Sequence, residues 1–336
     1  MPICRRRLLA LMLPAALAGG LLRPVLAQPT PPDPQPTPRP QPAAVKTVSF
    51  DAASIGRPTA YNVILPADYE TSGDKRYPVV YLLHGLTGNY GNWAGMGAGR
   101  AARGLDVIVV MPDGGNSWYV NWAQSDEGQK NAWDDFITKD LIAHVDANFR
   151  TVAAREGRAI NGLSMGGYGA LTLGLRHPDL YCAIGSHSGA LAWARSAGDR
   201  LRSGQEPPAR KGQPSDAPNE AIKIDGFRSP AERTPKGKAF LKPEDADAVD
   251  PFKLVLAVPK DKLPAIHVDC GTEDRLIANS REFARLLIEH NIPFTYGESA
   301  GAHDARYWSR EINTTMAIQA VALRRALARA AEAPRD

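Results

Sequence analysis

The sequence predicts an α/β fold with a mostly parallel central sheet and helices on both of its faces. Short apolar runs alternate with helical stretches along the chain, which is typical of a parallel sheet whose strands are joined by helices. A serine between glycines, in Gly162-Leu163-Ser164-Met165-Gly166, directly follows one of the apolar runs. One long stretch, residues 191–249, does not continue this alternation of apolar runs and helical stretches. Together these observations predict a single α/β domain over residues 45–331 with a lid-like insertion at 191–249.

The expected sheet opens with an antiparallel pair of strands and continues with parallel ones. The pair spans 45–50 and 59–65, and the later strands span 77–83, 106–111, 158–161, 181–186, 265–270 and 293–298. The expected helices span 133–148, 165–175, 279–290 and 305–331. Because the carboxyl ends of parallel strands meet at one edge of a sheet, the loops after these strands are where functional residues are expected.

Residues 1–27 have the pattern of a removable signal peptide. Three consecutive arginines precede an apolar run over 8–22, and Val25-Leu26-Ala27 supplies a small-x-small cleavage pattern before Gln28. The arginines also fit the twin-arginine pattern loosely, which leaves the general and the twin-arginine export routes both open. The apolar run is broken by proline and glycine and is shorter than the roughly 20 residues of a membrane span. We therefore expect a periplasmic or secreted protein without a stable membrane anchor.

The segment after the leader predicts an extended linker, because residues 28–44 are dominated by proline. The sequence carries a net charge of +4, and the four arginines of the leader account for it. A neutral mature domain without a basic run does not favour nucleic acid as a partner. No metal-ligand spacing of cysteine and histidine is present, so no metal or other cofactor is expected. Cys182 and Cys270 are expected to stay unpaired, since their strands would hold them too far apart for a disulfide. The oligomeric state stays open.

The serine between glycines has the pattern of a nucleophile elbow, a sharp turn that exposes a serine hydroxyl between a strand and a helix. Gly162 and Gly166 would let the strand and the helix approach closely while Ser164 holds a strained backbone conformation. A serine hydroxyl becomes a nucleophile when a base takes its proton and donors stabilise the oxyanion that forms. Ser164 is therefore the candidate nucleophile.

An acid and a histidine follow in the order that such an elbow predicts. Asp274 comes just after the strand 265–270, and His303 lies in a loop after the last strand. His303 would act as the general base, while Asp274 would fix its tautomer and stabilise the imidazolium. Glu273 is the second candidate for the acid. Asp269 is disfavoured because it lies inside an apolar strand.

Two backbone N–H groups, those of Leu86 and Met165, are expected to form the oxyanion hole, because His84-Gly85-Leu86 closes a strand at the same edge of the sheet. Such donors are worth about 3 to 4 kcal/mol each. His84 itself is expected to pack or hydrogen-bond rather than react. The remaining histidines are expected to be structural, namely His144, His177, His187, His267 and His290.

Five motifs in one order carry a resemblance to a known family. They are Leu82-Leu83-His84-Gly85, Met111-Pro112-Asp113-Gly114, Gly162-Leu163-Ser164-Met165-Gly166-Gly167, Cys270-Gly271-Thr272-Glu273-Asp274, and Ala302-His303-Asp304 with Tyr307-Trp308. Apart from the insertion, the chain from residue 45 onward resembles the esterase D / antigen 85-like family of α/β-hydrolases, closest to its tributyrin esterase and feruloyl esterase branch. The resemblance implies the α/β-hydrolase fold, with Ser164, Asp274 and His303 as a triad. The long polar insertion departs from the family pattern.

Aromatic side chains near the predicted catalytic edge are the candidates for substrate binding. Trp118, Tyr119 and Trp122 lie in one loop, and Trp308 lies close to His303. These rings would stack on a sugar or a phenolic ring, or would serve as packing residues of the core. The expected partner is a small-molecule or carbohydrate ester.

The sequence thus predicts an exported serine carboxylesterase that hydrolyses short-chain or aromatic acyl esters, with carbohydrate esters among the candidates, through an acyl-enzyme on Ser164. Two other catalytic interpretations stay open, an acyltransferase similar to the mycolyltransferases and a thioesterase similar to S-formylglutathione hydrolase. A non-catalytic binding module is disfavoured, because all three triad residues are present in order.

Overall fold

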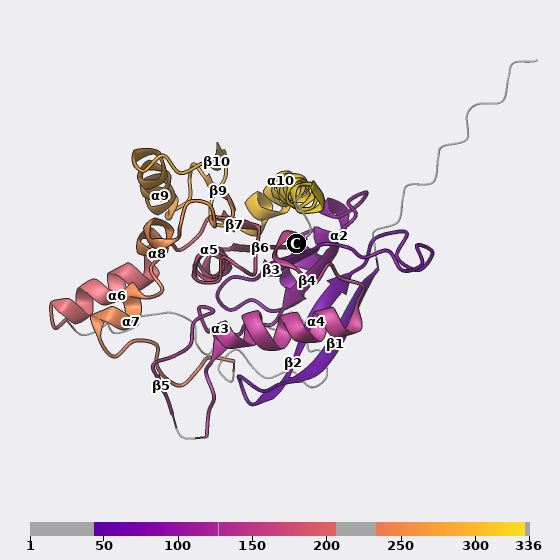
Figure 1. Cartoon of the computed structure of the whole chain (residues 1–336). Helices are drawn as coiled ribbons and strands as arrows, with labels where there is room; N and C mark the ends of the chain where they lie inside the picture. The colour runs from indigo at the N-terminus through magenta and orange to yellow at the C-terminus, as the bar shows by residue number, and fades with distance from the viewer. Residues whose placement is uncertain (1–43, 127, 206–232, 333–336) are drawn as a thin grey trace, which may run out of the picture. The chain divides into compact units, whose positions relative to one another are not determined.

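The computed structural model describes residues 44–126, 128–205 and 233–332. The predicted signal peptide, all but the last residue of the predicted linker, and the middle of the insertion, 206–232, lie outside the described residues. The described part is built around one central sheet (Figure 1).

The central sheet has eight strands in the order β1-β2-β4-β3-β6-β7-β9-β10. The strands are β1 (Val45–Ala52), β2 (Arg57–Ile64), β3 (Val79–Leu83), β4 (Ile108–Pro112), β6 (Arg158–Leu163), β7 (Ala183–His187), β9 (Ala265–Gly271) and β10 (Phe294–Ser299). β2 runs antiparallel to both β1 and β4, and each neighbouring pair from β4 to β10 is parallel. The predicted mostly parallel sheet with an antiparallel opening pair is confirmed.

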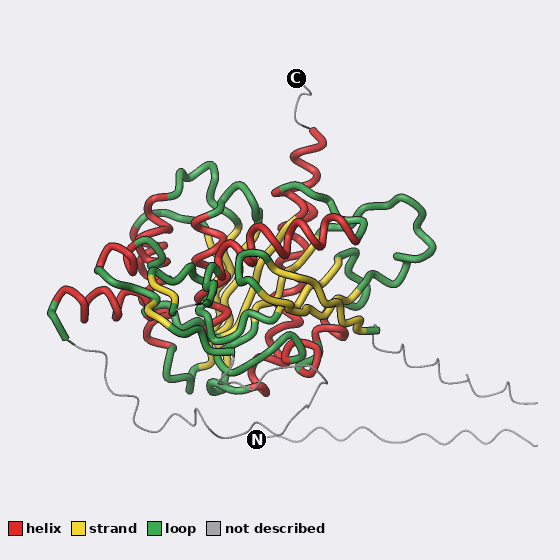
Figure 2. Tube along the Cα trace, turned by 90° about the horizontal axis from the view of Figure 1, so that it is seen from below, coloured by secondary structure: helices red, strands yellow, loops and turns green. Residues whose placement is uncertain are grey.

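Helices lie on both faces of the sheet, as Figures 1 and 2 show from two directions. They are α1 (Asn92–Gly95), α2 (Ala98–Ala101), α3 (Trp133–Asp135), α4 (Ile142–Asn148), α5 (Met165–Arg176), α6 (Trp193–Arg202), α7 (Pro243–Asp247), α8 (Pro251–Ala257), α9 (Ile277–Glu289) and α10 (Ala305–Glu332). α10 covers one face with α1 and α2, and α3, α4, α5 and α9 lie on the opposite side. Because helices bury both faces, β3 and β4 are apolar along their whole length, as parallel strands in such folds are.

The helix expected over 133–148 is present, but its middle is π-helical. α3 is followed directly by a π-helical segment, Phe136–Leu141, and then by α4. Within that segment the Thr138 hydroxyl donates to the Asp134 carbonyl oxygen at 2.8 Å, an acceptor that an α-helix would reserve for the Thr138 N–H. This side-chain competition gives a physical reason for the wider turn.

The described part of the insertion is more regular than its sequence indicates. It contains α6, α7 and a short strand, β8 (Gly237–Lys238), which pairs with β5 (Gln124–Ser125) in a separate two-stranded sheet. Trp193 of α6 stacks on Trp118, with ring centroids 4.2 Å apart and planes 4° from parallel. The described parts of the predicted insertion therefore contain short regular elements, which contacts with the body of the domain help to stabilise.

Cys182 and Cys270 are both buried and free, as predicted. Burial raises the pKa of the Cys182 thiol to about 12 and that of the Cys270 thiol to about 11. Within residues 44–126, 128–205 and 233–332, no helix combines the length and the apolar character that crossing a membrane requires.

Candidate active site

Ser164 lies on a sharp turn between β6 and α5, at the edge of the sheet where the parallel strands end. Its φ of 53° and ψ of −115° are strained for a residue with a side chain. The turn needs glycine on both sides, because a Cβ on Gly162 would lie 2.3 Å from the Gly166 carbonyl and one on Gly166 would lie 2.3 Å from the Leu83 carbonyl oxygen. The elbow thus presents Ser164 at the surface while its flanks pack against neighbouring backbone.

Ser164, His303 and Asp274 are connected by two contacts of hydrogen-bonding length, although 139 residues separate the serine from the histidine. Ser164 Oγ lies 2.9 Å from His303 Nε2, and His303 Nδ1 lies 2.8 Å from Asp274 Oδ2. With Nδ1–H donating to the carboxylate, Nε2 is left as an acceptor for the serine hydroxyl. The loops after β6, β9 and β10 supply one side chain each, so the topology of the sheet brings the three groups together.

The three carboxylates considered for the acid position lie in different environments. Asp274 is buried, its neighbour Glu273 is exposed, and Asp269 lies inside β9, where its carboxylate accepts the Tyr307 hydroxyl at 2.9 Å. Burial alone would raise the pKa of Asp274, but hydrogen bonds from His303 and from the Leu276 N–H outweigh it and lower the pKa below its ordinary value. Asp274 is therefore negatively charged at neutral pH and able to orient His303.

The two predicted oxyanion donors flank the serine. Met165 is the first residue of α5, so its N–H lies outside the helical hydrogen-bond ladder. Leu86 follows Gly85, where a Cβ would lie 3.4 Å from Ser164 Cβ, so this loop runs alongside the elbow. No acceptor for the Leu86 N–H is found within the described part of the chain. These observations are compatible with the predicted role of both N–H groups as oxyanion donors.

His84 anchors the turn over residues 84–88, which contains Leu86, as its expected structural role requires. Its Nε2 accepts the Gly114 N–H at 2.9 Å, which leaves Nδ1–H to donate to the Gly85 carbonyl oxygen at 2.7 Å. The Tyr119 hydroxyl donates to the His84 carbonyl oxygen at 2.9 Å. Both ring nitrogens of His84 are therefore occupied by backbone groups, which supports a structural role for this side chain.

Sequence reasoning missed the charged group behind this loop. Asp113 is buried, and its Oδ1 accepts from the Gly115 N–H at 2.9 Å and from Arg233 Nη2 at 2.6 Å. Burial alone would raise the pKa of Asp113, but His84 and Arg233 lower it to about 2. The position of Asp113 after a strand ending in Pro112 was a usable signal, because polar residues there face the catalytic edge. Arg233 carried no signal, since it lies in the insertion 120 residues away along the chain.

The four predicted substrate-binding aromatics occupy different environments. Tyr119 is fully buried against glycine backbone, so its assignment to substrate binding is corrected to a packing and hydrogen-bonding role. Trp118 is committed to its stack with Trp193, and Trp122 donates from Nε1 to the Ser117 carbonyl oxygen at 3.1 Å. Trp308 lies beside the site, its ring 4.9 Å from that of His303 and nearly perpendicular to it. Among these four aromatic residues, Trp308 is the one whose ring contacts the ring of His303.

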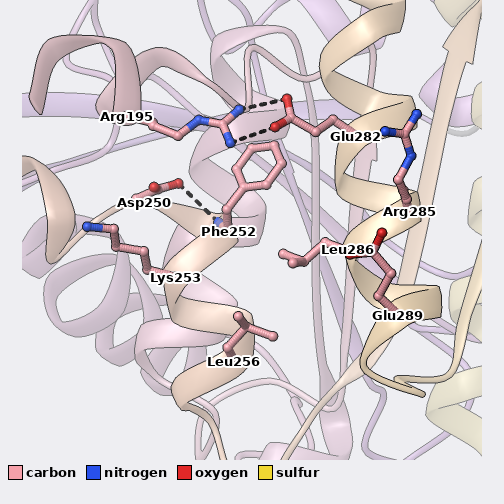
Figure 3. Close-up of a pocket in the computed structure, with 9 residues that line it drawn as sticks. All are labelled: Arg195, Asp250, Phe252, Lys253, Leu256, Glu282, Arg285, Leu286 and Glu289. Atoms are coloured by element: carbon pink, nitrogen blue, oxygen red, sulfur yellow. Dashed lines mark hydrogen bonds and ion pairs between the residues drawn. The ribbon is translucent and has the colours of Figure 1, made fainter. Parts of the chain in front are cut away.

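A hollow of about 400 Å³ lies elsewhere on the molecule (Figure 3). It is formed mainly by α8 and α9, and its apolar part is made by Phe252, Leu256 and Leu286. Arg195 of α6 pairs with Glu282 above Phe252. None of the predicted site residues lines it. Across the part of the chain that the structure describes, no cluster of three or more His, Cys, Asp or Glu side chains is arranged to hold a metal ion.

Comparison with known proteins finds relatives among the esterases. A family model described as a putative esterase matches residues 52–317. An esterase of Mycobacterium tuberculosis is 31% identical over 260 residues, which are 76% of this chain and 54% of that protein. The chain thus spans about half the length of its mycobacterial relative. The acetyl esterase of Caldicellulosiruptor saccharolyticus is 28% identical over 279 residues, which are 80% of this chain and 95% of that protein.

Among solved structures, the fluorophosphonate-binding serine hydrolase FphF of Staphylococcus aureus superimposes with a TM-score of 0.62 and 25% sequence identity. The match covers 83% of this chain and 99% of that chain. With the sheet order described above, it confirms that the described body has the α/β-hydrolase fold.

Proposed function

The chain belongs to the putative esterase family, and on that premise we propose that it is a serine carboxylesterase that hydrolyses short-chain or aromatic acyl esters. The observation that carries the proposal is the 2.9 Å distance between Ser164 Oγ and His303 Nε2, with Asp274 hydrogen-bonded behind the histidine. A serine and a histidine at this distance, oriented by a third group, are the arrangement that activates a hydroxyl for attack on a carbonyl.

In the first half of the reaction, Ser164 Oγ attacks the carbonyl carbon of the ester and its proton passes to His303 Nε2. The carbonyl oxygen becomes an oxyanion, which the N–H groups of Leu86 and Met165 stabilise. The tetrahedral intermediate then collapses, the bond to the alcohol breaks, and His303 returns the proton to the leaving oxygen. The acyl group is left on Ser164.

In the second half, His303 takes a proton from water, whose oxygen attacks the acyl carbon. The second tetrahedral intermediate expels Ser164 Oγ, which regains its proton from His303, and the carboxylic acid leaves. Asp274 stays ionised throughout and stabilises the imidazolium that forms twice in each cycle.

The proposed substrate class rests on two features. The acetyl esterase among the relatives matches 95% of its own length, which favours a short acyl group. Trp308 lies beside His303 and offers an aromatic wall to a phenolic or sugar ring. A panel of p-nitrophenyl esters of increasing chain length, together with methyl ferulate and an acetylated sugar, measures which class has the highest kcat/KM.

The decisive experiment replaces the nucleophile. Ser164→Ala is expected to lower kcat on p-nitrophenyl acetate by about 10⁴-fold or more, because no other group can form the acyl-enzyme. Ser309→Ala is the matched control, since that serine lies on α10 and belongs to no part of the proposed machinery. Full turnover by Ser164→Ala would sink the mechanism. Adding glycerol or trehalose to the wild-type assay and measuring acylated product distinguishes hydrolysis from acyl transfer.

We also propose that the protein is exported through the leader at residues 1–27. Expression of the full chain and of a chain lacking the leader, followed by cell fractionation, tests this. The full chain is expected outside the cytoplasm and the shortened one inside it. Export of the shortened chain would contradict the proposal.

A further inference from the structure

The oxyanion loop, residues 84–88, is a tight turn in which hydrogen bonds engage several of the polar backbone groups. The Gly88 N–H donates to the Gly85 carbonyl oxygen at 3.0 Å, and the Thr87 N–H donates to Asn116 Oδ1 at 2.7 Å. Thr87 has a φ of 66°, so the turn is held in a conformation that a side-chain residue adopts rarely. The orientation of the Leu86 N–H between these anchors therefore depends on the contacts that fix the turn.

One of those contacts comes from the insertion. Arg233 Nη2 donates to the Gly88 carbonyl oxygen, which is the last acceptor of the turn, and to Asp113 Oδ1 at 2.6 Å. The side chains of Arg233 and Asp113 are only 11% and 8% exposed, so water screens this pair weakly. A single guanidinium thus connects the insertion, the oxyanion loop and the buried carboxylate behind it.

The backbone around Arg233 is anchored independently of its side chain. The Arg233 carbonyl oxygen accepts the Asn116 N–H at 3.2 Å, and Thr234 Oγ1 accepts from Asn116 Nδ2 at 2.8 Å. Further along, β8 pairs with β5. Shortening the Arg233 side chain should therefore release the oxyanion loop while the returning limb of the insertion stays attached.

We infer that Arg233 is a positioning residue for the oxyanion hole, through its hydrogen bond to the Gly88 carbonyl oxygen and its pairing with Asp113. The inference rests on the proposed esterase function. Arg233 holds the turn that carries the Leu86 N–H, and its positive charge offsets a buried carboxylate that would otherwise oppose the negative oxyanion. The insertion is thereby part of the catalytic apparatus rather than an attachment to the surface.

The test compares two arginines of the insertion that both pair with an aspartate. Arg233→Met removes the contacts with Gly88 and Asp113, whereas Arg202→Met removes an exposed pair with Asp247 that lies between α6 and α7. Arg233→Met is expected to lower kcat by about 10- to 100-fold with little change in KM, because an oxyanion donor acts mainly in the transition state. Arg202→Met is expected to stay within twofold of the wild type.

A second readout does not require ester turnover. Amide hydrogen exchange of the peptide containing Leu86 and Gly88 is expected to be faster in Arg233→Met and unchanged in Arg202→Met. An inert wild type would refute the esterase proposal, and the exchange rates would still decide the role of Arg233. Wild-type kcat together with wild-type exchange in Arg233→Met would overturn the inference.

A further pair of variants covers the outcome in which Arg233→Met fails to fold, because an unpaired buried Asp113 destabilises the protein. Asp113→Asn removes that charge. The double variant that carries both Asp113→Asn and Arg233→Met can then be compared with Asp113→Asn alone. The double variant is expected to have a kcat at least about fivefold below that of Asp113→Asn, since the Gly88 carbonyl loses its donor in both backgrounds. Equal kcat values would overturn the inference.

Discussion

Two His–Asp pairs lie near the same edge of the sheet and differ in what surrounds them. His303 Nδ1 is 2.8 Å from Asp274 Oδ2, and His187 Nδ1 is likewise 2.8 Å from Asp269 Oδ2, although only the first contact has the angles of a hydrogen bond. The His303 side chain is 13% exposed, whereas that of His187 is completely buried. The distance between imidazole and carboxylate therefore does not distinguish a reactive pair from a structural one.

The two pairs also differ in what the second ring nitrogen of the histidine, Nε2, faces. His303 Nε2 faces Ser164 Oγ at 2.9 Å, while His187 Nε2 faces Asn161 Nδ2 at the same distance. Asn161 Oδ1 accepts the Gly162 N–H, so its amide nitrogen is left to donate to His187. An amide N–H offers no nucleophile to activate, and burial denies the pair both substrate and water. What each histidine faces, and whether solvent reaches it, are the grounds on which the proposed catalytic role goes to His303 rather than to His187.

The buried pair supports the reactive one. Asp269 also contacts His267, at 3.1 Å, and accepts the Tyr307 hydroxyl, which ties β9 to α10. The Ser164 N–H donates to the His187 carbonyl oxygen at 2.9 Å. The elbow is thus hydrogen-bonded to β7, the strand that carries His187, and we expect substitutions in the buried pair to affect stability before chemistry.

The largest expected difference separates the two histidines. His303→Gln is expected to lower kcat by about 10⁴-fold or more while the protein stays folded, because the general base is lost. His187→Gln is expected to keep kcat within about tenfold of the wild type and to lower the melting temperature. Steady-state kinetics and thermal unfolding of both variants measure the contrast. A folded His187→Gln as inactive as His303→Gln would break the comparison.

The two aspartates provide the next contrast. Asp274→Asn is expected to lower kcat by about 10⁴-fold with a small change in stability, because an amide favours the wrong tautomer of His303. Asp269→Asn is expected to lower the free energy of unfolding by about 3 to 5 kcal/mol, since a buried carboxylate with several partners is removed. Urea unfolding of both proteins, with kinetics on the folded fraction, distinguishes these outcomes. Equal stabilities would argue against the role given to Asp269.

The pairs should also respond to pH in separate ranges. Turnover is expected to fall in acid, because a protonated imidazole cannot accept the serine proton as a general base must. Burial alone would raise the pKa of Asp269, but His187 and His267 hold it well below its ordinary value. A carboxyl with a lowered folded pKa contributes stability above its unfolded pKa, and that stability is lost as the pH falls through the folded value.

The loss of stability from Asp269 is therefore expected only below about pH 4, the range of an ordinary aspartate. Activity profiles combined with unfolding at pH 5 and pH 3 measure the two ranges. The wild type should lose more stability between these pH values than Asp269→Asn does. A flat rate profile down to about pH 4 would argue against His303 as the base.

The smallest expected effect concerns Thr315, whose hydroxyl donates to Asp269 Oδ2 at the long distance of 3.4 Å. Thr315→Val is expected to lower the free energy of unfolding by about 1 kcal/mol or less and to leave kcat unchanged. Tyr307→Phe, which removes a bond of 2.9 Å to the same carboxylate, should cost more. The opposite order would show that the buried pair depends on packing rather than on hydrogen bonds.

The sheet and the candidate triad could be predicted from sequence because their signals are local. Each parallel strand is a short apolar run, and Ser164, Asp274 and His303 follow such runs in a recognisable order. The boundaries moved by one or two residues, as for β7, which begins at Ala183 rather than at 181. Register and strand order then bring the three loops together without any further information in the sequence.

The features that were missed depend on contacts between distant segments. Arg233 binds the oxyanion loop from within a polar stretch, and nothing in the surrounding residues indicates its partner. The sequence around Tyr119 predicts a loop aromatic near the surface, but its burial follows from the close approach of Gly114 and Gly169. The short helix α6 places Trp193 on Trp118, a stack between segments far apart in the chain that the sequence does not indicate.

The two free thiols described above have a consequence for handling the protein and for where it can fold. With pKa values raised to about 12 and about 11, Cys182 and Cys270 carry almost no thiolate at neutral pH, and the thiolate is the form that alkylating agents and oxidants attack. The folded domain should therefore resist iodoacetamide and peroxide. Because no disulfide joins the described residues, the domain should reach the same structure under oxidising and reducing conditions alike.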